Sequence, residues 1–215
     1  MASQPQSEPT IRFVFSPRLL EDIRRKSKIT FSAHFEKART IREKYETEQE
    51  WLGSISAFCA VFVSGALSYL LPKGEQLSRS QLFFGVPLLI GAVAVPNVLN
   101  YRVALFQKQE DYSKNAAIDW QELYEDATSF RNQVLQNPKN WDENKREEKL
   151  LELENKKKIL NAKHATTDRY CHSAVKDNVN KSFFAEELKV ATLYKAPQDV
   201  INSLQEILSK INGKV

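Results

Sequence analysis

Two uncharged stretches lie close together in this sequence: LGSISAFCAVFVSGALSYLL at residues 52–71 and LFFGVPLLIGAVAVPNVL at residues 82–99. The first contains 20 residues, and a helix of that length spans about 30 Å, the thickness of a bilayer core. A buried helix of a globular domain rarely needs so many uncharged residues in a row, and a second stretch follows after ten residues. The pattern therefore predicts two antiparallel helices that cross a membrane as a hairpin.

Basic residues are more frequent outside this predicted hairpin than in its connection. They precede it at Lys37, Arg39, Arg42 and Lys44 and follow it at Arg102, Lys108 and Lys114, whereas the connection holds Lys73 and Arg79. Because loops rich in Lys and Arg stay in the cytoplasm, this distribution predicts a two-pass integral membrane protein with both termini cytoplasmic.

The remaining sequence is polar and helix-rich. The predicted fold class is an all-α membrane protein in which the hairpin continues into long cytoplasmic helices that form a bundle. Five segments are expected: a flexible tail at 1–17, an amphipathic helix at 18–50, the hairpin at 51–101, a cytoplasmic helical hairpin at 102–175 and C-terminal amphipathic helices at 176–215.

An apolar seam with heptad-like spacing follows the second uncharged stretch. Its residues are Tyr112, Ala116, Trp120, Leu123, Ala127, Phe130 and Val134. Such a seam requires a partner helix, so we expect it to hold subunits together. Asn137-Pro138 should end this helix. Asn140, with Glu143 three residues later, predicts the N-cap of the next helix.

Small and polar residues are the informative ones within the hairpin. A set of small residues suited to close helix packing comprises Gly53, Ala57, Ala60, Ser64 and Ser68. These residues pack either the two helices of one hairpin or neighbouring subunits, and the sequence does not separate these alternatives. Asn97 and Asn100 either line a pore or lie at the membrane interface, where Pro96-Asn97 would mark the end of the helix.

No motif for catalysis, metal binding or cofactor binding is recognisable, so neither an enzyme nor a cofactor is expected. His164 with Cys171-His172 lacks the spacing of metal ligands. The net charge of +4 and the interleaved charges argue against nucleic acid as a partner. The runs Arg24-Arg25-Lys26 and Lys156-Lys157-Lys158 fit either a solvated helix face or contact with anionic lipid.

The layout resembles a known family. An amphipathic helix with Ala38-Arg39 and Arg42-Glu43-Lys44-Tyr45 leads into the hairpin, and a helix with Trp120, Leu123 and Tyr124 follows it. A charged helix then runs from Leu150-Leu151-Glu152-Leu153 to His164-Ala165-Thr166-Thr167-Asp168-Arg169-Tyr170. Over about residues 31–175 this pattern resembles the SLATT domain, a two-transmembrane effector domain associated with nucleotide-sensing defence systems.

The resemblance implies an oligomeric membrane effector that forms a pore or perturbs the bilayer when a sensor detects a nucleotide signal. The segment 183–215 is too short for a nucleotide-binding domain, so either sensing would fall to a separate partner or the chain would have another trigger. The expected partners are the lipid bilayer, further copies of the chain and that sensor. The alternative is a non-catalytic structural or accessory subunit of a larger membrane complex.

Overall fold

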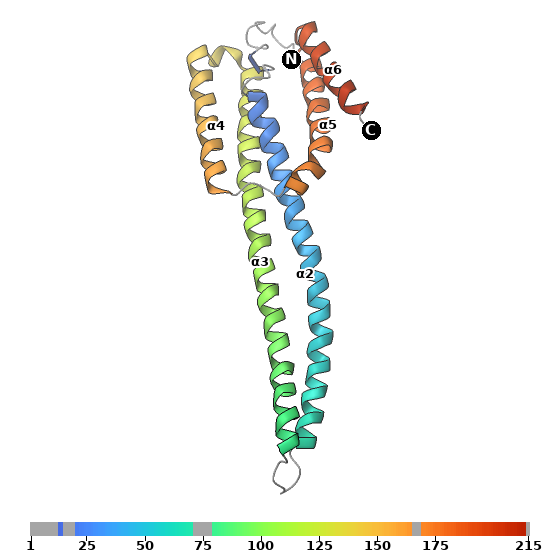
Figure 1. The fold of residues 1–215 in the computed structure, drawn as a ribbon. Coiled ribbons are helices and arrows are strands. Elements are labelled where there is room, and N and C mark those ends of the chain that lie inside the picture. Colours follow the sequence, from blue (N-terminus) through green and yellow to red (C-terminus); the bar gives the residue numbers. More distant parts are fainter. Residues whose placement is uncertain (1–12, 15–19, 71–78, 165–168, 214–215) are drawn as a thin grey trace. The chain divides into compact units, whose positions relative to one another are not determined.

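The computed structural model describes residues 13–14, 20–70, 79–164 and 169–213, and these residues are all-helical (Figure 1). They form α2 (Leu20–Leu70), α3 (Arg79–Gln136), a 3-10 turn η1 (Pro138–Asn140), α4 (Glu143–Lys163), α5 (Arg169–Leu193) and α6 (Gln198–Asn212). The side chains of 66–70, 79–86, 88, 89 and 169 are not described. Most of the predicted tail and of the predicted hairpin connection lies outside the described residues.

The predicted crossing of a membrane is wrong. In the part of the chain that the structure describes, no helix combines the length and the apolar character that a membrane span needs. The prediction counted residues without charge, and that criterion also passes serine, glycine, asparagine and proline, which favour transfer into lipid far less than leucine does. This finding also contradicts three further predictions: the membrane part of the fold class, the two-pass topology and the cytoplasmic placement of both termini.

Of the two prolines expected to mark a helix end, Pro138 does so and Pro96 does not. α3 continues through Pro87 and Pro96 to Gln136, so Pro96-Asn97 does not end the helix. α3 does end just before Asn137-Pro138, as predicted, because a residue that precedes proline is disfavoured in the helical region.

The N-cap of α4 is Asp142 and not Asn140. The Asp142 side chain accepts a hydrogen bond from the backbone N–H of Lys145 at 2.9 Å. Asn140 belongs to the preceding 3-10 turn, so its side chain is placed too early to reach the first free N–H groups of α4.

The chain divides into two compact units. Unit 1 comprises residues 1–37 and 113–215, and unit 2 comprises residues 38–112. The first part of α2 and the last part of α3 therefore belong to unit 1, together with α4, α5 and α6.

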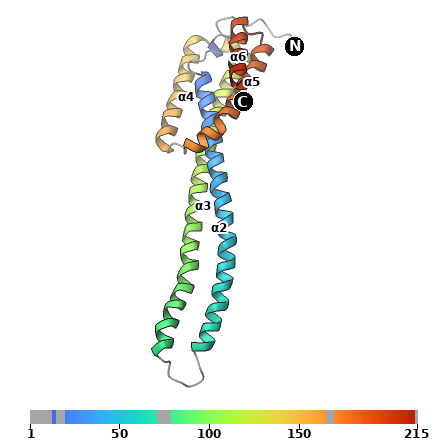
Figure 2. The same cartoon turned by 45° about the vertical axis from the view of Figure 1, so that its right-hand side comes forward.

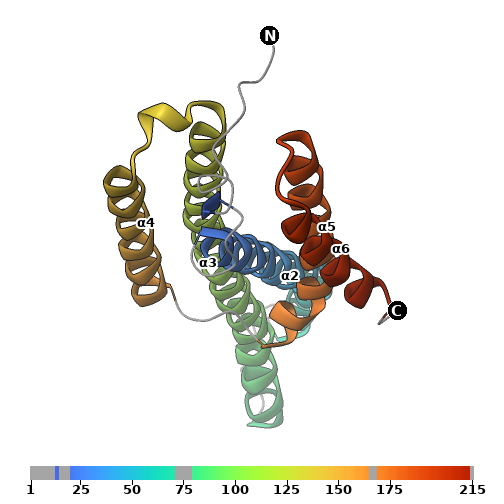
Figure 3. The ribbon, with the colours of Figure 1, turned by 90° about the horizontal axis from the view of Figure 1, so that it is seen from above.

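Unit 1 is a helical bundle with one apolar core. Figures 1 and 2 show α4 beside the last part of α3 and α5 beside the first part of α2, and the view in Figure 3 shows α6 beside α5. Its core brings together residues from all five helices, among them Leu20, Ile23, Leu123, Phe130, Leu153, Phe183 and Leu204. Ion pairs of Lys156 with Asp126 and of Lys163 with Asp119, both at 2.6 Å, join α4 to α3.

Unit 2 is an antiparallel helix pair. Glu48 pairs with Arg102 at 2.9 Å, and the hydroxyl of Tyr45 accepts a hydrogen bond from Gln107 at 3.0 Å. The half-buried residues recur at intervals of three or four, which is the spacing of a coiled-coil seam. On α2 they include Tyr45, Glu48, Leu52, Ile55, Cys59 and Val63, and on α3 they include Ala92, Pro96, Leu99, Val103 and Phe106.

The position of the α4 cap can be tested by substitution. Asp142→Ala should lower the free energy of unfolding of unit 1 by about 1 kcal/mol, because one N–H of the first turn loses its partner. Asn140→Ala is the matched control and should change it by less than about 0.5 kcal/mol. Urea unfolding followed by tryptophan fluorescence measures both variants. The reverse order of effects would contradict this cap assignment.

Candidate functional site

A buried ionic cluster joins three helices of unit 1. Arg24 on α2 and Arg131 on α3 both donate to Oε1 of Glu187 on α5, at 2.7 and 2.5 Å. All three residues are at least 98% buried. Arg24 also donates to the hydroxyl of Thr128 at 3.1 Å, so the cluster connects α2, α3 and α5 through charged hydrogen bonds.

Aromatic rings lie beside the positively charged Arg24 of the cluster. The Arg24 guanidinium lies 5.2 Å from the ring centroid of Phe183 and 5.8 Å from that of Tyr124, within the range of cation–π contact. Burial lowers the pKa of Arg131, and Arg24 lowers it further, whereas Glu187 opposes both effects. Among the described residues, Nη2 of Arg24 has no hydrogen-bond partner. The cluster is closed to solvent and tightly engaged, so its role is to fix how α5 packs on α2 and α3.

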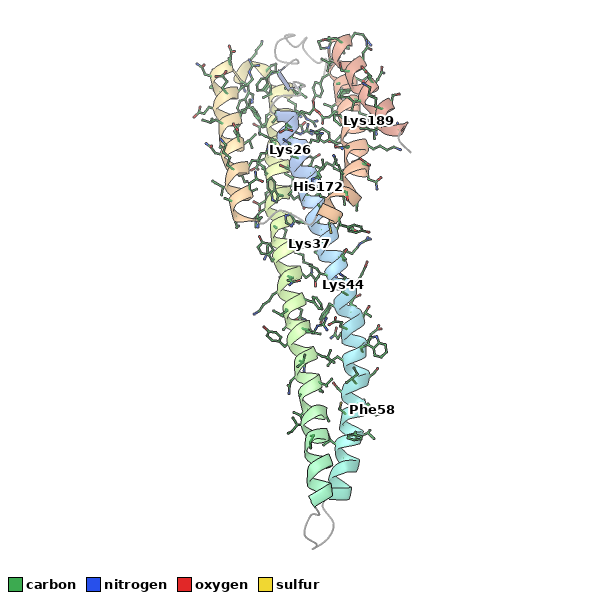
Figure 4. The ribbon with its side chains drawn as sticks, in the orientation of Figure 1. Lys26, Lys37, Lys44, Phe58, His172 and Lys189 are labelled. Atoms are coloured by element: carbon green, nitrogen blue, oxygen red, sulfur yellow. The ribbon has the colours of Figure 1, made fainter. Side chains whose placement is uncertain are left out.

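The candidate functional site is the outer apolar surface of unit 2. We use this name for the exposed apolar side chains that point away from the seam. They are Trp51, Phe58, Val61 and Phe62 on α2 and Ile90, Val93, Val95, Val98, Tyr101 and Leu105 on α3. Phe58, labelled in Figure 4, is 72% exposed, and Val61 is 74% exposed. Large exposed apolar side chains gathered on one helix pair make this surface a candidate interaction site.

Polar side chains on this surface bond to their own helix. Ser54 donates to the carbonyl of Glu50, Ser64 to that of Ala60 and Asn97 to that of Val93, at 3.2, 2.8 and 2.9 Å. Such local bonds satisfy the donor of each side chain within its own helix. A molecule that covers the outer apolar surface therefore needs to supply few hydrogen bonds.

The glycines of this surface have no packing neighbour among the described residues. A Cβ added at Gly53, Gly65 or Gly91 would meet nothing within 4 Å in the described part of the chain. Glycine inside a helix costs about 1 kcal/mol relative to alanine. Close approach of a neighbouring surface would account for small residues at these positions.

The predicted packing residues lie on the exposed side of α2. Gly53, Ala57, Ala60 and Ser64 are all exposed, whereas the side chain of Ser68 lies outside the described residues. For the four described positions, packing within one hairpin is therefore not the explanation. Asn97 and Asn100 are also exposed, on the outer side of α3. Because the crossing is wrong, their predicted place in a pore mouth loses its basis.

The predicted oligomerisation seam is filled within one chain. Six of its seven residues are at least 96% buried in the core of unit 1: Ala116, Trp120, Leu123, Ala127, Phe130 and Val134. Tyr112, in unit 2, is 42% exposed. The first part of α2, together with α4 and α5, supplies the partners that the heptad spacing requires, so this seam leaves no apolar face for a second subunit.

Two further candidates from the sequence were the basic run at 156–158 and a metal site. Lys156, Lys157 and Lys158 each pair with a carboxylate, on Asp126, Asp22 and Glu154. This basic run is therefore largely neutralised by its own unit. No group of three His, Cys, Asp or Glu side chains suited to a metal ion occurs among the described residues.

Sequence reasoning missed both the ionic cluster and the outer apolar surface. Arg24 had the appearance of one member of a basic run, although Leu20 and Ile23 beside it are core residues. Glu187 follows Phe183-Phe184 by three to four residues, which places it on the same helix face as these buried rings. The position of Arg24 and Glu187 beside apolar core residues was the sequence signal that could have revealed the ionic cluster.

No family model, curated protein sequence or solved structure matches this chain. The resemblance to the SLATT domain therefore stays a prediction that rests on the residue pattern.

The ionic cluster can be tested with two adjacent glutamates. Glu187→Gln should lower the free energy of unfolding of unit 1 by about 3–5 kcal/mol, because it removes the close carboxylate of Arg24 and leaves Arg131 only Glu186, at 3.9 Å. Glu186→Gln is the comparison: Glu186 also pairs with Arg131, but at 3.9 Å and with a side chain that is 40% exposed, so this change should cost less than about 1 kcal/mol. Urea unfolding measures both, and equal effects would contradict the proposed role of the cluster.

Proposed function

We propose that this chain is a non-catalytic helical assembly protein in which the outer apolar surface of unit 2 binds unit 2 of further copies. The observation that carries this proposal is the exposure of large apolar side chains on both helices of a pair whose described seam residues are mostly half-buried. Charge is absent from residues 51–72 and 80–101, so a contact over these residues would desolvate no charged side chain.

The available area is sufficient for a stable contact. Trp51, Phe58 and Tyr101 keep 66, 72 and 67% of their surface exposed. A large aromatic side chain buries about 150–250 Å², so these three could bury about 300–500 Å² of one copy. The facing surface of a second copy would lose a similar area, so the contact would approach the roughly 1,000 Å² that a specific interface needs, before any aliphatic residue of the first copy is counted.

Three faces of α2 differ in shape. Residues 58, 59 and 60 point about 100° apart in succession, because a helix has 3.6 residues per turn. Cys59 lies in the seam with Leu52, Ile55 and Val63. The bulky face carries Trp51, Phe58 and Phe62, with the last two rings stacked at 6.4 Å. The shallow face carries Gly53, Ala57, Ala60 and Ser64.

This shape difference favours a second copy as the occupant. The bulky face of one chain is complementary to the shallow face of another, and both faces are apolar. A contact between two different faces repeats from copy to copy, so it builds rings or chains of more than two subunits. The pore-forming role depended on the membrane crossing and is not part of this proposal; a structural or accessory role is.

The two faces can be tested separately. Phe58→Glu places a charge on the bulky face, and Ala60→Leu fills the shallow face; each should weaken association by about 2–4 kcal/mol. Leu151→Glu is the matched control, since Leu151 is 59% exposed on α4 of unit 1. Light scattering after size-exclusion chromatography, without detergent, should give small species for the first two variants and the wild-type mass for the third.

Mixing the two variants gives the sharper result. Each retains one intact face, so the mixture should form a dimer that does not extend further. A mixture that stays monomeric would contradict contact between unlike faces. A wild-type chain that stays monomeric in solution and floats with phosphatidylcholine vesicles would overturn self-assembly in favour of lipid as the occupant.

A further inference from the structure

Two of the three histidines of the chain face each other inside unit 1. His34 on α2 is 98% buried, and His164, the C-cap of α4, is 94% buried. Their ring centroids lie 6.3 Å apart in an edge-on arrangement. This pair therefore lies where the end of α4 meets α2.

The two rings differ in their hydrogen bonds. Nε2 of His164 lies 2.6 Å from Oδ2 of Asp119 on α3, and Lys163 donates to the same oxygen at 2.6 Å. Nδ1 of His34 is buried and has no hydrogen-bond partner in the described part of the chain. A proton on His164 would thus meet a carboxylate, whereas a proton on His34 would meet none.

Three effects shift the pKa of His34, and all of them oppose its protonation. Burial is the largest effect, His164 on α4 is the next and Lys37 on α2 follows; together they lower the pKa of His34 to about 4. Asp119, the carboxylate on α3, is bonded to His164 and Lys163. The closed arrangement therefore holds His34 in its neutral form.

We propose that the His34–His164 pair is an acid-sensitive latch, which holds the end of α4 against α2 and α3 at neutral pH and releases it when His34 takes up a proton. A neutral His34 ring packs against His164 without charge repulsion. A protonated His34 would be a buried cation beside His164 and near Lys37, so it is stable only after the contact opens and water reaches the ring.

The carboxylates of the ion pairs that also hold α4 do not titrate in the same pH range as His34. The hydrogen bond from Lys163 lowers the pKa of Asp119, and the contact with His164 lowers it further. Burial opposes ionisation of Asp22, but hydrogen bonds from Lys26 and Lys157 outweigh it and lower its pKa. Both carboxylates remain charged at pH 5, so the latch responds to acid before these ion pairs do.

The sign and size of the effect follow from linkage. Because the pKa of His34 is about 4 when closed and 6.5 when free, the contact is strongest above pH 6.5 and weakens as the pH falls towards 4. The opening equilibrium should rise about 30-fold between pH 7.5 and pH 5, with a limit of about 300-fold below pH 4.

Hydrogen exchange of the full chain tests the latch. After correction for intrinsic exchange rates, protection of amides at 155–164 should fall about 30-fold between pH 7.5 and pH 5, while amides of α6 keep theirs. His34→Phe keeps a ring but cannot titrate, so it should abolish this pH dependence. His172→Phe is the matched control, because His172 is half-buried on α5, and it should behave as the wild type.

Two results would overturn the latch. One is equal protection of the α4 end at both pH values in the wild type, and the other is an unchanged pH dependence in His34→Phe. If that variant does not fold, titration of the wild-type histidine resonances by NMR decides: His34 should titrate near pH 4, and a midpoint above pH 6 would contradict the proposal.

Discussion

The pairing of Arg24 and Arg131 with Glu187 is the constraint on which unit 1 depends. A buried ion pair contributes little net stability compared with an apolar core of the same shape, but any arrangement that separates its members leaves a buried charge unpaired. Because the three residues come from α2, α3 and α5, only one packing of these helices satisfies them. The cluster thus selects a single arrangement from the many that amphipathic helices allow.

The two units differ in how their apolar residues are used. In unit 1 the heptad seam, α4, α5 and α6 cover one another, and the large core residues are buried. In unit 2 a narrow seam buries one face of each helix only in part, and residues such as Phe58, Val61 and Ile90 stay exposed. Serine and asparagine side chains there bond to their own backbone, which prepares the surface to be covered by apolar groups.

Helix positions could be read from the sequence, but helix partners could not. Apolar spacing predicted the helix around 112–134, and Pro138 predicted its end. The seam from Ala116 to Val134 appeared to require another subunit because its partners, at 20–37, 150–160 and 183–187, are distant in sequence. Absence of charge was mistaken for membrane-spanning character. Of the site, the small residues from Gly53 to Ser64 were recognised, whereas their exposure depends on where α3 packs.

The central claim is that copies of this chain cover the outer apolar surface of unit 2. Sedimentation equilibrium of the wild-type chain, over a range of micromolar concentrations and without detergent, tests it most directly. The account predicts species larger than a dimer of the 24.7 kDa chain, with a mass that rises with concentration until assembly is complete. A single species of 24.7 kDa at every concentration would contradict it.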